Sequence, residues 1–380
     1  MIVHILPDSV FIRDLIQKIQ RYSDNPLNNQ YCVFTPKPWK HLSEENPQII
    51  SAPLYSKSIN EVINNLSSTD TLVFHNFRRE VYTWFISHPK KCKVCWVFWG
   101  AELFNMPMIK LERPLFLPKT LKASFLKKVD QYGLQKIPFL RVLENFYIKN
   151  IKAPKIKAIA QKAFERVDFF YHFNAYDFQV LQKNFNVPTK LEHFVYPTLF
   201  TPGDNLSLEV SPNKINILVG NSADPNSNHL DVFDMLPKDE AISYWVPLSY
   251  TNYPKYREKV IKVGREKFGD AFKPILNFLP SDEYFAFLQK MDFAVFGSIR
   301  SKALGNILAL LAYGKGVYLH PGTNTYNNLT DQGIKVFDLQ DLSLERFKEN
   351  KKQLPLTHNQ QNVLALYGEE HIGKIYKKLF

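Results

Sequence analysis

The sequence predicts an α/β protein of 380 residues built from two Rossmann-like domains with a cleft between them. Three observations lead to this prediction. Short apolar runs rich in β-branched and aromatic residues alternate with longer amphipathic stretches, which is the rhythm of parallel βαβ units. The chain is too long for one ordinary core, since domains hold roughly 100–200 residues. A polar stretch with proline and glycine, residues 197–213, separates two halves that each hold this alternation.

The elements follow in order along the chain. The first half is expected to hold strands at 2–6, 31–34, 71–75, 94–99, 168–173 and 191–196, and helices at 9–22, 59–66, 80–87 and 174–185. The second half is expected to hold strands at 214–219, 242–248, 273–276, 293–296, 317–319 and 335–338, and helices at 253–268, 281–290, 304–313, 344–349 and 360–379. We therefore predict a first domain over residues 1–205, a second over 206–360, and a C-terminal helix over 361–380.

Positive charge concentrates in one segment. The formal net charge is +12, and between residues 110 and 166 fourteen Lys or Arg stand against four acidic residues. We expect this segment to be an amphipathic insertion in the first domain. It could bind an anionic membrane, at about 1 kcal/mol per basic residue, bind nucleic acid, or be a solvated surface. No nucleic-acid-binding motif supports the second option. The lysines expected to face a membrane are Lys119, Lys122, Lys127 and Lys128.

Several classes of protein lose support. We expect the N-terminus to form a first β-strand and not a signal peptide, and no run of about 18 apolar residues predicts a membrane-spanning helix. We expect a cytoplasmic protein whose membrane contact is peripheral. Cys92 and Cys95 have CxxC spacing without the second pair that zinc needs. GxxxxGK[ST], GxGxxG and Asp-x-Asp patterns are missing, so we expect no dinucleotide, no metal and no other cofactor.

Three residues directly after predicted strands could act as a catalytic base, because ligands of open α/β sheets bind at the carboxyl ends of the strands. They are Asp8, His75 and Glu102. Each has a structural alternative: Asp8 could cap a helix, His75 could be a hydrogen-bonded structural histidine, and Glu102 could be a first-turn acid. Trp99 and Gly100 precede Glu102, and the glycine permits a tight turn that presents an indole for stacking on a sugar.

Two loops in the second half could hold a diphosphate. Gly220, Asn221 and Ser222 follow a strand, and small residues there allow backbone amides to approach an anion. Later, Arg300 and Lys302 precede an apolar helix that starts near Gly305, and a helix N-terminus with basic neighbours suits a diphosphate. The alternative is a pair of ordinary turns.

Several stretches occur in an order that resembles a known family. They are Phe-His at 74–75, WVFWGAEL at 96–103, Tyr-Pro-Thr at 196–198, ILVGNSAD at 217–224, VPLSY at 246–250 and Leu-Gly-Asn at 304–306. The chain is similar here to glycosyltransferase family 56, the bacterial TDP-N-acetylfucosamine:lipid II N-acetylfucosaminyltransferases, also called 4-alpha-L-fucosyltransferases. Members of the family carry Asp where this chain has Glu102.

The resemblance implies a GT-B fold, with the acceptor on the first domain and the nucleotide sugar on the second. It implies transfer of an acetamido-dideoxyhexose (Fuc4NAc-like) from a dTDP-sugar to a polyprenyl-diphosphate-linked glycan in surface polysaccharide synthesis. It places the enzyme on the cytoplasmic face of the bacterial inner membrane. The residues expected to bind the donor are Gly220, Asn221, Ser222, Val246, Pro247, Arg300, Lys302, Leu304, Gly305 and Asn306. The alternative function is a non-catalytic peripheral membrane protein that binds a sugar nucleotide or glycan.

Overall fold

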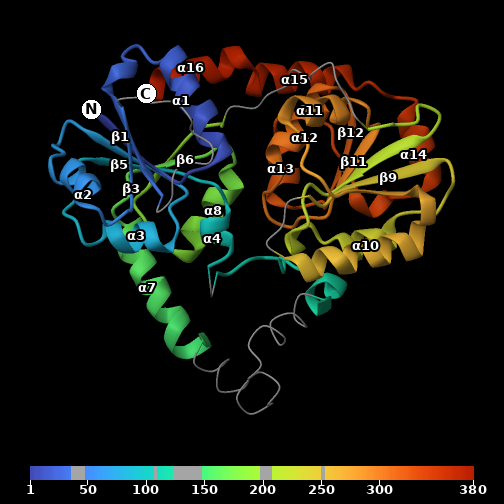
Figure 1. The fold of residues 1–380 in the computed structure, drawn as a ribbon, viewed down its shortest axis with the longest axis horizontal. Coiled ribbons are helices and arrows are strands. Elements are labelled where there is room, and N and C mark those ends of the chain that lie inside the picture. The colour runs from blue at the N-terminus through green and yellow to red at the C-terminus, as the bar shows by residue number, and fades with distance from the viewer. Residues whose placement is uncertain (36–47, 107–108, 124–147, 197–207, 250–252) are drawn as a thin grey trace. The chain divides into compact units, whose positions relative to one another are not determined.

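A computed structural model describes residues 1–35, 48–106, 109–123, 148–196, 208–249 and 253–380. The chain divides into two compact units, and each is described by itself (Figure 1). Unit 1 comprises Met1–Leu111, Val142–Pro197 and Glu369–Phe380, and unit 2 comprises Glu112–Arg141 and Thr198–Gly368. Each unit contains one sheet whose described strand pairs are all parallel, so the two α/β domains predicted from the sequence are confirmed.

Unit 1 holds a seven-stranded sheet in the order β3-β2-β1-β4-β5-β6-β7. Its strands are β1 (Ile2–Leu6), β2 (Asn29–Phe34), β3 (Ile49–Ala52), β4 (Thr71–His75), β5 (Lys93–Val97), β6 (Phe169–Tyr171) and β7 (Lys190–Glu192). Its helices are α1 (Val10–Tyr22), α2 (Lys57–Asn64), α3 (Arg79–Phe85), α4 (Ala101–Phe104), α7 (Ala153–Phe164), α8 (Ala175–Asn184) and α16 (Glu369–Leu379). The strand order reverses between β1 and β4, which makes the carboxyl ends of these two strands the expected ligand position.

Aromatic side chains cover both faces of the first sheet. On one face Phe77 and Trp96 pack against Phe164 of α7, with ring centroids 5.8 and 4.6 Å from it. On the other face Phe194 packs on Tyr376 of α16 and on Phe380 beyond it. Strands that are buried on both faces read as nearly continuous apolar runs, which is why they were recognisable in the sequence.

Unit 2 holds a six-stranded sheet in the order β10-β9-β8-β11-β12-β13. Its strands are β8 (Ile215–Val219), β9 (Ile242–Pro247), β10 (Phe272–Ile275), β11 (Phe293–Phe296), β12 (Gly316–Leu319) and β13 (Phe337–Asp338). Its helices are α9 (His229–Met235), α10 (Pro254–Phe268), α11 (Ser281–Gln289), α12 (Leu304–Ala312), α13 (Asn324–Asp331), α14 (Leu344–Lys351) and α15 (Thr357–Tyr367). The order reverses between β8 and β11, so the loops after these strands meet at one place.

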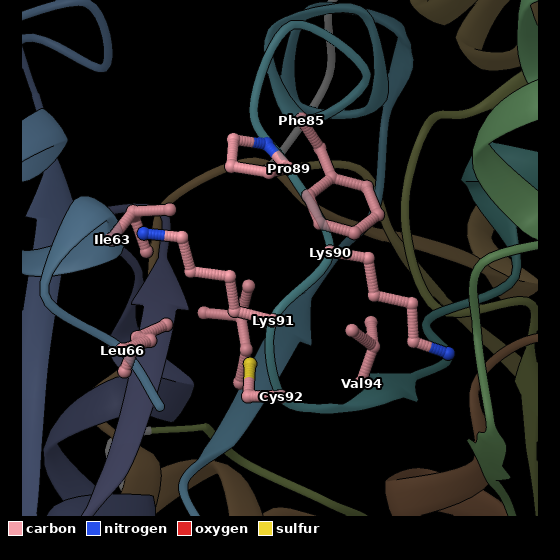
Figure 2. A pocket seen from close by; sticks show the side chains of 9 residues that line it. Ile63, Leu66, Phe85, Pro89, Lys90, Lys91, Cys92 and Val94 are labelled. Carbon is pink, nitrogen blue, oxygen red and sulfur yellow. The ribbon is translucent and has the colours of Figure 1, made fainter. Parts of the chain in front are cut away.

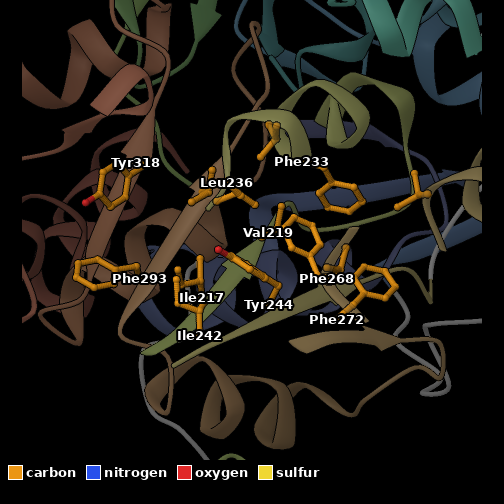
Figure 3. Packing of buried hydrophobic residues seen from close by; sticks show 14 of the residues in the cluster. Ile217, Val219, Phe233, Leu236, Ile242, Tyr244, Phe268, Phe272, Phe293 and Tyr318 are labelled. Carbon is orange, nitrogen blue, oxygen red and sulfur yellow. The ribbon is translucent and has the colours of Figure 1, made fainter. Parts of the chain in front are cut away.

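The core of unit 2 lies between this sheet and helices α9, α10 and α14. Figure 3 shows Ile217, Tyr244 and Phe293 of the sheet gathered with Phe233 and Phe268 of the helices. All five side chains are buried. Burying one large apolar side chain stabilises the fold by roughly 1.5–3 kcal/mol, so this cluster holds the strands whose ends carry the candidate donor loops.

The structure differs from the sequence prediction at four elements. Strand β3 and helices α9 and α13 were not expected. The helix expected at 360–379 is two helices, α15 and α16, separated by Gly368. Gly368 has an extended backbone with ψ 171°, and a side chain there would meet the carbonyl oxygen of Leu364 at 2.3 Å. The turn therefore requires a glycine, and the C-terminal helix groups with unit 1.

The start of the basic segment also differs from the expectation of an insertion within the first domain. Residues from Glu112 onward group with unit 2. The side chain of Asn228 donates to the carbonyl of Leu115 and accepts from the amide of Leu117, at 3.1 and 3.0 Å. The carboxylate of Asp231 accepts from the amides of Lys119 and Thr120, both at 2.9 Å. These four hydrogen bonds attach the described part, 112–123, to helix α9.

Candidate functional site

The three predicted catalytic residues lie at or just after the ends of the neighbouring strands β1, β4 and β5, at the carboxyl edge of the first sheet. Asp8 is half-buried directly after β1. His75 is the last residue of β4 and is fully buried. Glu102 lies in α4 after β5 and is 6% exposed. Parallel pairing thus brings their three strand ends to one edge, as the sequence predicted.

His75 is enclosed by hydrogen bonds on both sides of its ring. Its Nε2 lies 3.1 Å from Nδ1 of His4, and its Nδ1 is bonded to the hydroxyl of Tyr196. Burial, and next the neighbouring His4, hold the pKa of His75 well below its ordinary value, so the ring is neutral. Both nitrogens are therefore engaged, which fits the structural alternative for His75 and not the role of a base open to substrate.

Glu102 holds the turn that follows β5. Its Oε1 accepts from the backbone amide of Trp99 at 2.7 Å and from the indole Nε1 of Trp96 at 3.2 Å. Gly100 has φ +97°, a conformation that side-chain-bearing residues rarely adopt, so the prediction of a glycine-dependent tight turn is confirmed. The carboxylate thereby fixes the backbone of Trp99, whose indole Nε1 donates to the hydroxyl of Tyr196 at 2.7 Å.

A buried histidine–aspartate pair at the same edge was missed. Nε2 of His172, directly after β6, lies 2.9 Å from a carboxylate oxygen of Asp177 in α8, and both residues are buried. Asn174 caps α8 by accepting from the amide of Tyr176. The His-x-Asn-x-x-Asp pattern at 172–177 was the available signal, because Asn174 and Asp177 have N-cap and N3 spacing.

In unit 2 the switch point brings two predicted donor loops together around Lys302. Its Nζ lies 3.0 Å from Oγ of Ser227, 3.4 Å from Oγ of Ser222 and 3.8 Å from a carboxylate oxygen of Asp224. The lysine comes from the loop after β11, and its three partners follow β8. The two strands pair directly, which explains why residues 80 positions apart in the chain meet.

The charges at this point are held in a largely dry environment. Burial lowers the pKa of Lys302 to about 8, although Asp224 opposes the shift. Burial alone would raise the pKa of Asp224, but Lys302 and the hydrogen bonds from Asn226 bring it below its usual value. Lys302 therefore stays cationic at neutral pH with a carboxylate nearby. A buried ammonium among hydroxyl groups can bind a phosphate oxygen.

The remaining predicted donor residues divide into two groups. Val246 and Pro247 are buried, and the side chain of Val246 belongs to the hydrophobic core. Asn221, Arg300, Leu304 and Asn306 are half-buried and Gly305 is exposed. Leu304, Gly305 and Asn306 form the first turn of α12, whose N-cap residue, Ala303, makes no side-chain cap. The side-chain amide of Asn306 donates to the hydroxyl of Tyr284 at 2.8 Å.

Gly220 and His229 shape the loop after β8. Gly220 has φ +70°, and a methyl group on it would lie 2.6 Å from Nε2 of His229. The His229 ring is fully buried, and burial lowers its pKa to about 3, so it is neutral. Gly220 therefore allows the backbone to pass directly over this ring. Ser227, Asp224 and His229 were not among the predicted donor residues, although the GNSAD sequence at 220–224 marks the loop they share.

The four lysines predicted to face a membrane are only partly described. Lys127 and Lys128 lie outside the described residues. Lys122 is exposed, and Lys119 forms an ion pair with Asp234. Among the described residues, no helix combines the length and the hydropathy needed to cross a bilayer.

A small hollow in unit 1 lies away from these sites. Figure 2 shows Ile63, Phe85 and Cys92 around it, beside the amino end of β5. The candidate residues lie at the carboxyl ends of the strands, so the hollow does not belong to them. Cys92 and Cys95 are both buried thiols, and burial raises the pKa of Cys95 to about 11.

Comparison with known proteins identifies the family. The sequence profile described as 4-alpha-L-fucosyltransferase, glycosyl transferase group 56, matches residues 152–377. The chain belongs to this family. It is therefore a glycosyltransferase, and the resemblance noted in the sequence is confirmed.

Solved structures confirm the GT-B fold. Sucrose-phosphate synthase from Thermosynechococcus elongatus superposes with a TM-score of 0.65 at 10% identity, covering 100% of this chain and 98% of that one. HepE from Anabaena, solved with UDP, gives 0.60 at 10% identity, covering 100% and 98%. The E. coli trehalose-6-phosphate enzyme, solved with UDP-2-fluoro glucose, gives 0.61 at 8% identity, covering 99% and 97%. At identities this low, the likenesses show only that this chain shares the fold of these structures; the family is shown by the sequence profile.

Proposed function

We propose that this glycosyltransferase moves an acetamido-dideoxyhexose, Fuc4NAc-like, from a dTDP-sugar to a polyprenyl-diphosphate-linked glycan in bacterial surface polysaccharide synthesis. Unit 2 binds the donor and unit 1 binds the acceptor. The single observation that carries the proposal is the arrangement of Lys302 with Ser222 and Ser227 at the switch point of a Rossmann-like sheet.

The donor assignment rests on charge and on backbone geometry. The diphosphate of a nucleotide sugar leaves with negative charge, and a positive, water-poor position stabilises that charge. Lys302 supplies the cation, two serine hydroxyls supply further hydrogen bonds, and the uncapped start of α12 supplies backbone amides. The solved structures of HepE and the trehalose-6-phosphate enzyme hold UDP and a UDP-sugar on the same fold, which supports a nucleotide-sugar donor here.

The acceptor assignment rests on the carboxyl edge of unit 1. Trp99 is half-buried at the edge where the sheet carries its candidate residues. Aromatic faces stack on the apolar faces of sugars, and the fixed indole offers such a face. Asp8, half-buried after β1, is a further predicted base at this edge.

Calorimetric titration with dTDP, UDP and GDP tests the donor site. We expect dTDP to bind most tightly, and Lys302→Met to weaken it roughly 10–100-fold, as for a lost charge-assisted hydrogen bond. Lys315→Met is the matched control. Lys315 is also half-buried, but it precedes β12 and so lies at the amino ends of the strands, away from the donor loops at their carboxyl ends. Equal affinity of wild type and Lys302→Met for dTDP would contradict the site.

An activity assay with a dTDP-sugar tests transfer. Release of dTDP from this sugar only when a prenyl-diphosphate-linked aminosugar is added would support transfer. Binding of the dTDP-sugar without release of dTDP would favour the non-catalytic alternative.

We also propose that unit 1 contacts the anionic cytoplasmic face of the inner membrane. Lys152, Lys155 and Lys162 are exposed in or beside α7, and Ile151, which precedes the helix, is 53% exposed. Each basic residue near an anionic bilayer contributes about 1 kcal/mol. Replacing the three lysines by Gln is expected to reduce sedimentation of the protein with phosphatidylglycerol vesicles. Its sedimentation with neutral vesicles should not change.

A matched triple variant controls for the loss of charge. Lys255, Lys259 and Lys262 are exposed on α10 of unit 2, and replacing them by Gln removes the same charge elsewhere. Equal sedimentation of the two triple variants would show that the face of α7 has no special affinity for the bilayer.

A further inference from the structure

We propose that Asn29, His4 and His75 act as positioning residues that hold Trp99 and Tyr196 in one orientation at the carboxyl edge of the first sheet. The proposal rests on the proposed function for its ligand, an acceptor sugar that stacks on Trp99. The hydrogen-bonded relay itself rests on geometry alone.

The relay links five side chains from five separate parts of unit 1. Trp99 Nε1 lies 2.7 Å from the Tyr196 hydroxyl, which is bonded to Nδ1 of His75. Nε2 of His75 lies 3.1 Å from Nδ1 of His4, and Nε2 of His4 lies 3.0 Å from Oδ1 of Asn29. Asn29, His4 and His75 are each no more than 1% exposed. Water therefore has no access to the inner members of the relay.

The chemistry of the Asn29 end and the neutral state of both rings fix the direction of the bonds. The side-chain amide oxygen of Asn29 only accepts, so His4 carries its proton on Nε2 and donates to that oxygen. Because the His4 ring is neutral, its Nδ1 accepts, so His75 carries its proton on Nε2 and donates to His4. Nδ1 of the neutral His75 ring then accepts from the Tyr196 hydroxyl, whose oxygen accepts from the indole nitrogen of Trp99. Only one tautomer of each ring satisfies the whole relay.

The Asn29 end is held by the backbone. Its amide nitrogen donates to the carbonyl of Pro26 at 3.3 Å and to that of Phe380 at 3.5 Å, which fixes Oδ1 toward His4. The Phe380 carbonyl also accepts from Oγ of Ser23 at 2.6 Å. Burial lowers the pKa of His4 to about 4, which is consistent with a neutral ring. The relay therefore runs from this fixed end, through the sheet interior, to the half-buried Trp99.

A fixed indole lowers the cost of binding a sugar. Ordering a side chain on association takes free energy away from affinity, and preorganisation removes that loss. Trp99 is held at two points: its indole nitrogen donates to the hydroxyl of Tyr196, and its backbone amide donates to the carboxylate of Glu102. Tyr196 in turn packs edge-on against the Trp99 and His75 rings. Breaking the relay inside the sheet should therefore loosen Trp99 without removing any group that touches the sugar.

Two variants break the relay, and one leaves it intact. His4→Phe keeps an aromatic ring against Tyr31 and Phe380 but removes both nitrogens. Tyr196→Phe removes only the hydroxyl. Tyr31→Phe is the control, because the Tyr31 hydroxyl is buried and has no hydrogen-bond partner among the described residues, while its ring stacks on His4 at 5.0 Å.

Fluorine NMR of 5-fluorotryptophan reads the orientation of Trp99 directly, with the resonance assigned through Trp99→Phe. We expect one sharp line in wild type and Tyr31→Phe, and a shifted or split line in His4→Phe and Tyr196→Phe. Unchanged lines in both relay variants would overturn the proposal. In wild type, nitrogen-15 spectra should show both His4 and His75 as the neutral Nε2–H tautomer between pH 6 and 8. A charged ring or an Nδ1–H tautomer would overturn it without any mutation.

Kinetics with a prenyl-diphosphate-linked aminosugar and a dTDP-sugar complete the test. Loss of one or two neutral hydrogen bonds predicts an acceptor KM raised about tenfold in the relay variants, with donor KM within about twofold of wild type. Unchanged acceptor KM in an active enzyme would reject the positioning role and leave the transferase standing. If wild type transfers no sugar, the proposed function fails, and the fluorine and nitrogen spectra still decide the relay.

Discussion

Replacing Gly220 by Ala tests whether the loop after β8 is built around His229. The glycine has φ +70°, and the added methyl group would lie 2.6 Å from Nε2 of the fully buried imidazole. A left-handed backbone costs an alanine roughly 1–2 kcal/mol. Overpacking a buried contact typically costs about 1–3 kcal/mol. The free energy of unfolding should therefore fall by about 2–5 kcal/mol.

Two other glycines separate these contributions. Gly333 has the same φ of +70°, but a methyl group there would meet its nearest atom, Nδ2 of Asn362, at an ordinary 3.5 Å. Gly333→Ala should therefore show the backbone cost alone. Gly305 has nothing within 4 Å of an added methyl group and lies outside the left-handed region, so Gly305→Ala should not lower stability.

Calorimetric thermal unfolding of the three variants is the assay. A domain of this size loses roughly 2–4 °C in Tm per kcal/mol, so Gly220→Ala should unfold about 2–12 °C below Gly333→Ala. Adding His229→Ala should make Gly220→Ala less costly, because contacting residues are not additive. Equal Tm values for Gly220→Ala and Gly333→Ala would refute the assigned contact between the loop and the imidazole.

Three further predictions follow from the described contacts. Because burial lowers the pKa of Lys302 to about 8, dTDP affinity should fall as pH rises through 8, and Lys302→Arg should show no such fall in titrations between pH 7 and 9. The pKa of His4 is lowered to about 4, so between about pH 4 and 6.5 the unfolded chain binds more protons than the folded protein. The free energy of unfolding, measured with urea, should therefore decrease as the pH is lowered from about 6.5 to 4, and should decrease less in His4→Phe. Asp231 accepts from the amides of Lys119 and Thr120, and Asp231→Asn leaves one amide without its carboxylate oxygen. Losing this cap should lower the free energy needed to open the segment by about 1 kcal/mol. Because trypsin cleaves the open form, the cleavage rate in this segment should rise about fivefold.

The two sheets were predictable because their strands are buried on both faces and therefore read as continuous apolar runs. The three missed elements lack this signal. Strand β3 is an edge strand of four residues with no fully buried side chain. Helices α9 and α13 are short, and polar residues such as Asp231 and Asn327 interrupt any apolar period. Gly368 divides α15 from α16 at a position where any side chain would collide with the carbonyl oxygen of Leu364, and no periodicity in the sequence reveals this.

The donor loops were predictable for a topological reason. Once two strands are assigned to the switch point of a Rossmann-like sheet, the loops after them must meet, so Ser222 and Lys302 were expected to share a site. The sequence could not show that Ser227 and Asp224 complete the surroundings of the ammonium group. Those positions depend on the short 3-10 helix Pro225–Ser227, whose start Asp224 caps by accepting from the amide of Asn226.

The first site shows why a histidine at a strand end is ambiguous in a sequence. A base and a structural histidine both require the ring at the carboxyl edge; they differ in what the second nitrogen meets. For His75 that partner is His4, 71 positions earlier, and the partner of the other nitrogen is Tyr196, 121 positions later. Neither separation leaves a local pattern. Only the pairing of β1 with β4 and the course of the chain after β7 bring the three rings together, so the enclosure of His75 could not be predicted from the sequence around it.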